Sequence, residues 1–188
     1  VDTCLFDFQQ LDYTPPFSCL ILAIKLNEFK KKFPNVKFKA SNFKHLKYAS
    51  HIGFFKAFGL NFGKDMGEAS GSDSYIPITE VKVKEIHEKS QQLKKHFNEH
   101  LVDESQKLAT ILTRQDSGEL VETLSYSIRE IWRNVIEHSK SDTYYYCAQY
   151  WQSKNQVEVG IVDLGIGIKK GLIQNPHIKV DSDYEALA

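Results

Sequence analysis

Three polar side chains, Glu130, Asn134 and His138, recur at four-residue intervals and could do chemistry together. At helical spacing, residues i, i+4 and i+8 fall on one face, so the sequence predicts one helix that presents all three side chains to the same space. An apolar stripe runs beside them, formed by Ile128, Ile131 and Val135. The polar face could bind a ligand, and the alternative is the solvated side of an ordinary amphipathic helix.

A second stretch of interest, residues 163–167 (Asp-Leu-Gly-Ile-Gly), is predicted to follow a β-hairpin. Residues 143–151 are dense in aromatic side chains, residues 152–155 form a polar turn, and residues 156–164 alternate between apolar and polar. The hairpin therefore places the Asp-Leu-Gly-Ile-Gly stretch at the end of its second strand.

Asp163 is predicted to lie on the buried face of that strand. It is in phase with three apolar residues, Val157, Val159 and Ile161. Burying an unpaired carboxylate is costly, so a donor from the protein or from a ligand must reach Asp163. Gly165 and Gly167 lack a Cβ, which lets a flat or anionic ligand approach the backbone. The alternative is a tight turn with an ordinary Asp bend.

Taken together and in this order, the two stretches resemble the GHKL family of ATP-binding domains. That family covers DNA gyrase, heat-shock chaperones, sensor histidine kinases and the anti-sigma-factor serine kinases. Its N box has Glu, then Asn four residues later and often His four beyond that, as in Glu130, Asn134 and His138. Its first glycine box is Asp-x-Gly-x-Gly, which residues 163–167 match, and Asp163 follows Asn134 by 29 residues.

The resemblance implies a role for each matched residue in phosphoryl transfer from ATP. Asn134 would supply an amide oxygen to magnesium, which prefers hard oxygen ligands. Glu130 would orient and deprotonate the attacking water or hydroxyl group. Asp163 would accept a hydrogen bond from the adenine amino group. The other cofactor-binding residues implied are His138, Gly165, Ile166 and Gly167; an outer-shell or capping role is the alternative for His138.

The function that this resemblance implies is an ATP-binding protein of the histidine kinase-like ATPase family, with ATP and Mg²⁺ as cofactors. Magnesium-dependent hydrolysis or phosphoryl transfer in signalling would make it an ATPase or a protein kinase. The alternative is a non-catalytic protein-interaction module that keeps the fold. Glu130 favours catalysis, since a relic that only binds would not need a base. The residues leave open whether the phosphoryl acceptor is water, Ser or His.

Residues 1–62 predict a separate small α/β domain. Strands are expected at 4–8 and 36–40, a helix at 17–33 between them, and shorter helices at 45–52 and 54–60. This layout resembles a STAS-type domain, the fold of the anti-anti-sigma factors. The resemblance is one of layout, because the turn at residues 14–17 reads Thr-Pro-Pro-Phe and lacks the serine that STAS domains phosphorylate.

The predicted fold class is therefore α/β (α+β), with a STAS-like domain at 1–62, a linker or long loop at 63–82, and a GHKL-type two-layer sandwich at 83–188. Residues 75–79 favour an edge strand interrupted by Pro77. Residues 83–113 predict an amphipathic helical region that packs on its own domain or on a second chain. The chain lacks an initial Met, so we expect a piece of a longer protein whose ATP lid and second glycine box follow residue 188.

The amino-acid composition limits which binding partners and which cellular location are expected. The 188 residues contain no apolar run of membrane-spanning length, which predicts a soluble, cytoplasmic protein without a membrane partner. The three cysteines have no CxxC spacing, which argues against a disulfide framework or a zinc site. The net charge is zero and no nucleic-acid module is present, so no nucleic acid is expected. The expected partners are ATP and a protein or second copy bound through the N-terminal domain or helix 83–113.

Overall fold

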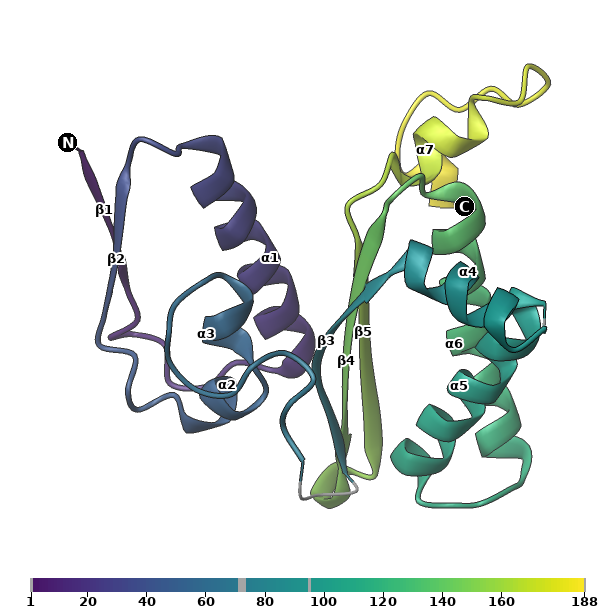
Figure 1. Cartoon of the computed structure of the whole chain (residues 1–188), viewed down its shortest axis with the longest axis horizontal. Coiled ribbons are helices and arrows are strands. Elements are labelled where there is room, and N and C mark those ends of the chain that lie inside the picture. Colours follow the sequence, from purple (N-terminus) through teal and green to yellow (C-terminus); the bar gives the residue numbers. More distant parts are fainter. Residues whose placement is uncertain (1, 71–73, 95, 188) are drawn as a thin grey trace. The chain divides into compact units, whose positions relative to one another are not determined.

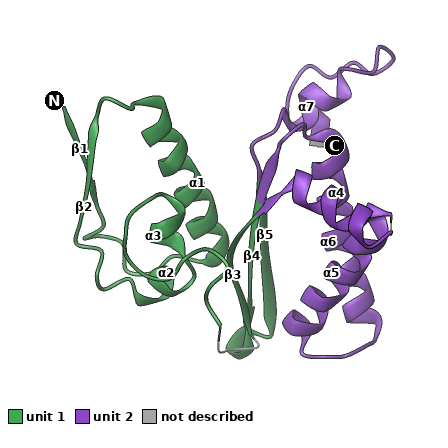
Figure 2. Cartoon of the chain, in the orientation of Figure 1, with its two compact units in different colours: residues 1–80, 145–162 green, residues 81–144, 163–188 purple. Residues whose placement is uncertain are grey.

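The computed structural model describes residues 2–70, 74–94 and 96–187, which form a mixed α/β protein (Figure 1). These residues make seven α-helices and two small sheets, with strand orders β1-β2 and β3-β4-β5. The predicted mixed α/β class is confirmed at this level. Two compact units divide the chain: residues 1–80 with 145–162, and residues 81–144 with 163–188 (Figure 2). Among the described residues, no helix is both long and apolar enough to cross a membrane.

Unit 1 begins with a β-α-β arrangement made of β1 (Thr3–Asp7), α1 (Pro16–Lys32) and β2 (Lys37–Ser41). A proline at its start favours α1 because its fixed φ suits the first helical turn, and three consecutive lysines end the helix where the dipole favours cations. The two strands pair in parallel, from Thr3 opposite Lys37 to Asp7 opposite Ser41. The predicted strand, helix and strand are confirmed to within a residue or two.

An aromatic core holds unit 1 together. The short helix α3 (Phe54–Ala57) contributes Phe54 and Phe55, which are completely buried, and the neighbouring helix α2 (Lys47–His51) buries Ala49. Their rings meet Phe8 edge to face, with centroids 6.0 and 5.6 Å away. Burial of several phenyl rings is the main source of stability for a unit of this size.

The second sheet contains β3 (Tyr75–Lys82), β4 (Thr143–Trp151) and β5 (Gln156–Asp163). A one-turn 3₁₀ helix, Gln152–Lys154, joins β4 to β5, so the predicted hairpin is confirmed. β3 lies at an edge of this sheet, as its proline predicted.

Part of the stretch at 63–82, expected to be a linker, is integrated into unit 1. Gly67 N–H donates to the Ile78 carbonyl at 2.9 Å, and Ala69 is buried. Strand β3 itself occupies the last eight residues of the stretch. Within the expected linker, Gly71, Ser72 and Asp73 lie outside the described residues.

Strand β5 corrects one expectation about burial. Its expected buried face, which carries Asp163, is only half-buried. The one fully buried residue of the strand is Gly160, on the opposite face, where a Cβ would meet Phe17 at 2.8 Å. Both faces of β5 are thus partly covered. The alternation of apolar and polar residues in its sequence therefore does not separate a buried face from a solvent-exposed one.

Unit 2 contains α4 (Val83–Gln92), α5 (Phe97–Thr113), α6 (Glu119–His138), α7 (Gly167–Leu172) and a 3₁₀ turn, Glu185–Leu187. The single helical region expected at 83–113 is therefore two helices. Lys94 has a left-handed φ of 52°, and the His96 side chain accepts from Asn98 N–H to cap α5. A left-handed residue ends a helix, and a new cap starts another.

Candidate functional site

Helix α6 carries three predicted site residues, Glu130, Asn134 and His138, and is anchored by its opposite face. That face buries Val121, Ser125, Ile128, Trp132 and Val135. It packs against α5, where the Ser105 and Ser125 hydroxyl oxygens lie 3.0 Å apart in a buried hydrogen bond. The helix begins after Gly118 without a side-chain cap, and Glu119 and Glu122 support its first turn through the helix dipole.

Glu130 lies on the outer part of α6 and is engaged by two arginines. Its Oε2 is 2.6 Å from Arg133 Nη2, one turn later, and its Oε1 is 3.6 Å from Arg129 Nη2. The carboxylate is 23% exposed, so it can still meet solvent or a ligand. Short guanidinium–carboxylate contacts of this kind fix the rotamer of the acid.

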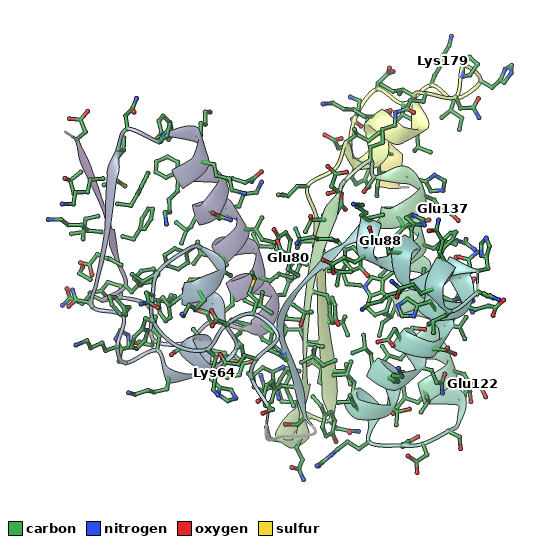
Figure 3. The ribbon with its side chains drawn as sticks, viewed as in Figure 1. Lys64, Glu80, Glu88, Glu122, Glu137 and Lys179 are labelled. Carbon is green, nitrogen blue, oxygen red and sulfur yellow. The ribbon has the colours of Figure 1, made fainter. Side chains whose placement is uncertain are left out.

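Asn134 and His138 follow along the same helix, and both are exposed. His138 Nε2 is 3.7 Å from Glu137 Oε2, and Glu137 in turn is 3.9 Å from Arg133 Nε. Figure 3 labels Glu137, near the C-terminal end of α6. Positive and negative side chains therefore alternate along this face. Asn134 is the uncharged residue among them, and its amide oxygen could bind a cation.

The hydrogen-bond donor that Asp163 was expected to need is supplied by a backbone N–H group of the protein. Its Oδ1 accepts a hydrogen bond from Gly165 N–H at 2.8 Å, which closes a tight Asx turn at the end of β5. The carboxylate is half-buried. Among the described residues, Oδ2 has no hydrogen bond, so this oxygen is available to a ligand donor.

The loop at residues 163–167 is held against the end of α6. Ile166 N–H donates to the Ser139 carbonyl at 2.8 Å. A Cβ at Gly165 would lie 2.1 Å from that same carbonyl oxygen, far inside van der Waals contact. Gly165 is therefore required by the approach of two protein segments, a reason that the sequence did not reveal. This contact places the loop next to the C-terminal end of α6, one residue after His138.

Gly167 has a different role from Gly165. Its φ is +76°, a left-handed conformation that favours glycine, and a Cβ there would meet nothing within 4 Å. The residue starts α7, none of whose side chains is buried. Open space thus adjoins the loop at Gly167.

Arg133 and Ser139 contribute contacts here but were not among the predicted site residues. Arg133 stands three residues after Glu130 and four before Glu137, so helical spacing alone could have predicted both ion pairs. Ser139 contributes only its carbonyl oxygen, for which no side-chain signal exists.

No metal-ligand cluster of His, Cys, Asp or Glu occurs in the part of the chain that the structure describes. A single amide such as Asn134 is compatible with magnesium, which keeps several waters and phosphate oxygens in its shell. A depression of about 530 Å³ occurs in unit 1, lined by Gln9, Asp12, Asn42, Phe43, Lys44 and His45, and it includes none of the predicted site residues.

The chain matches no protein-family model, and searches of curated proteins and of solved structures found no match either.

Proposed function

We propose that unit 2 binds ATP with magnesium in the manner of the histidine kinase-like ATPases and serves phosphoryl transfer. The observation that carries this proposal is the junction between the two motifs, where the Ser139 carbonyl accepts from Ile166 N–H. It fixes the Asp163 loop at the end of the helix that carries Asn134. Adenine would bind the available oxygen of Asp163, and the phosphates would extend along the polar face of α6 with their magnesium on Asn134.

The chemical groups on this face suit a phosphoryl donor. Asn134 is exposed, so a hydrated ion can reach its amide oxygen. Glu130, one turn earlier, is the group that would accept the proton of the attacking nucleophile. A STAS-like module in unit 1 would then be the partner or sensor part of the same protein.

The ion pairs of Glu130 favour a second candidate, an ATP-binding interaction module without turnover. A carboxylate whose oxygens both face arginines has fewer free lone pairs for a nucleophile. Hydrolysis assays separate the two candidates. If Glu130 is the base, Glu130→Ala lowers turnover by about 10²–10⁴-fold and leaves ATP affinity unchanged. Equal turnover in the two proteins favours the interaction module.

Titration of the chain with ATP, with and without magnesium, tests the binding site itself. The Asp163→Asn variant is expected to lose about 1–3 kcal/mol of ATP affinity, because a charged acceptor becomes a neutral amide. Asn134→Ala should remove the magnesium dependence of binding. Lys179→Ala, a change of an exposed residue away from the motifs, is the matched control. Unchanged affinity in Asp163→Asn would contradict the adenine assignment.

A further inference from the structure

The β1-β2 sheet of unit 1 is unusually small for a parallel sheet. Parallel strands occur almost entirely within larger sheets, and two strands by themselves are marginal. Among the described residues, β1 pairs with β2 alone. One full edge of β1 is thus open to another strand.

Two hydrogen bonds show which residues of β1 line the open edge. Lys37 N–H donates to the Asp2 carbonyl at 2.9 Å, and Phe8 N–H donates to the Ser41 carbonyl at 3.1 Å. Even-numbered residues therefore direct their backbone groups to β2. Because the direction alternates along a strand, the N–H and C=O groups of the odd-numbered residues between them point away from β2.

We propose that this edge is a dimer interface, in which two copies of the chain pair β1 with β1 in antiparallel orientation about Leu5. In this register Leu5 lies opposite Leu5 of the second copy, and Thr3 lies opposite Asp7. All three are odd-numbered residues, whose backbone groups point away from β2. Each such pair becomes a doubly hydrogen-bonded pair of the antiparallel ladder, so every outward-facing N–H and C=O group of these residues gains a partner.

The side chains of β1 suit self-pairing in the same register. Leu5 is 56% exposed, a large value for a leucine in a strand, and its counterpart would cover it. Thr3 and Asp7 share the exposed face of the strand, and their pairing sets a neutral hydroxyl against the acid. No two like charges oppose each other.

The other edge of the sheet is unsuited to the same contact. β2 exposes Lys37 and Lys39, and antiparallel self-pairing about its middle residue would place Lys39 against Lys39. Like charges directly opposite destabilise a ladder, and lysines are a common protection of edge strands. Charge therefore selects β1 as the self-complementary edge, and the resulting two-fold symmetry closes the assembly at two copies.

Sedimentation velocity of the complete chain, from about 1 to about 200 μM, tests the proposal, since an interface this small predicts a Kd on the order of 10–100 μM. Leu5→Lys and Leu5→Glu should each be monomeric throughout, because like charges meet at the two-fold axis. An equal mixture of the two should recover the dimer. Lys39→Glu, on the other edge, is the matched control and should dimerise like the wild type.

A variant that strengthens dimerisation tests the register even if circular dichroism shows that the Leu5 variants fold poorly. Thr3→Lys places a cation opposite Asp7 on both sides of the axis, so dimerisation should tighten about fivefold. A wild-type chain that stays monomeric at every concentration overturns the proposal. So does a folded Leu5→Lys variant with wild-type self-association, a charge mixture that stays monomeric, or a Thr3→Lys variant that binds no more tightly.

Discussion

Arg133 Nη2 lies 2.6 Å from Glu130 Oε2, one helical turn away on the solvent-facing side of α6. Arg133 also stands 3.9 Å from Glu137, so the same guanidinium can serve either acid. The shorter contact is the one to Glu130, and a shift of the guanidinium towards Glu137 would free the Glu130 carboxylate. The proposed base is therefore under the direct control of a neighbour on its own helix.

Releasing that contact is expected to alter turnover more than binding. In Arg133→Ala, the rate of ATP hydrolysis should rise about 2–10-fold because Glu130 Oε2 gains a free lone pair, while ATP affinity stays unchanged. Steady-state kinetics and a binding titration measure the two effects. Glu137→Gln, which leaves the Arg133–Glu130 pair in place, is the control. A lower rate in Arg133→Ala would instead mean that Arg133 positions Glu130 for catalysis.

Gly165→Ala is expected to destabilise the protein by about 2–3 kcal/mol, because a Cβ would collide with the Ser139 carbonyl. Gly167→Ala has room but keeps a left-handed φ, so its cost should be about 1 kcal/mol. Gly171→Ala, inside α7 with nothing within 4 Å, should be neutral or slightly stabilising. Urea unfolding of the three variants ranks their losses in stability. Equal unfolding midpoints would contradict a close contact between Gly165 and the Ser139 carbonyl.

Glu158 on β5 caps the start of α1, which makes it a second position for a stability test. Its Oε1 accepts from Phe17 N–H at 3.2 Å and its Oε2 from Trp151 Nε1–H at 3.3 Å. Glu158→Ala removes both acceptors and should cost about 1–2 kcal/mol in urea unfolding. Glu158→Gln keeps an acceptor oxygen and should lose less. Equal losses in the two variants would show that charge, not hydrogen bonding, is the source of the effect.

The protein is expected to lose stability in alkali between about pH 9 and 12. Burial raises the pKa of the Tyr145 hydroxyl to about 12, helped by its hydrogen bond to Glu80, and burial raises the pKa of the Cys19 thiol to about 12. Both groups hold their protons more tightly when folded, so their contribution is complete below their ordinary pKa values and is lost as pH rises through the raised ones.

Urea midpoints measured from pH 8 to pH 11.5 check this expectation, with the decline set by the raised pKa values of Tyr145 and Cys19. Tyr145→Phe removes one titrating group and should make the decline shallower. Tyr184→Phe is the matched control, because the Tyr184 side chain is 83% exposed. A decline of unchanged steepness in Tyr145→Phe would exclude Tyr145 as a contributor.

Local patterns predicted most of the secondary structure. Proline at the start and lysines at the end delimit α1, and the polar turn at 152–155 marks the hairpin, because such signals act within a few residues of each other. The break between α4 and α5 was missed because Lys94 adopts a left-handed φ that its residue type does not favour.

The site was predictable where side chains carry the chemistry and not where the backbone does. Glu130 and Asn134 were found because helical spacing places them on one face. The reason for Gly165 was not found, because it depends on the backbone carbonyl of Ser139. Any residue at that position would supply the same oxygen, so the sequence carries no signal for it. The division into units was also hidden, since strands β4 and β5 join residues 1–80 across a long separation in sequence.

The hydrogen bond between Ile166 and Ser139 closes the base of the loop that contains the whole β4–β5 hairpin. Closing a loop at its base costs entropy that grows only slowly with length, by about 0.6 kcal/mol for each doubling. The turn at Gln152–Lys154 is thus a suitable place to insert a peptide tag or a fluorescent reporter. Such an insertion would lengthen the hairpin while the pinned ends keep Asp163 beside α6.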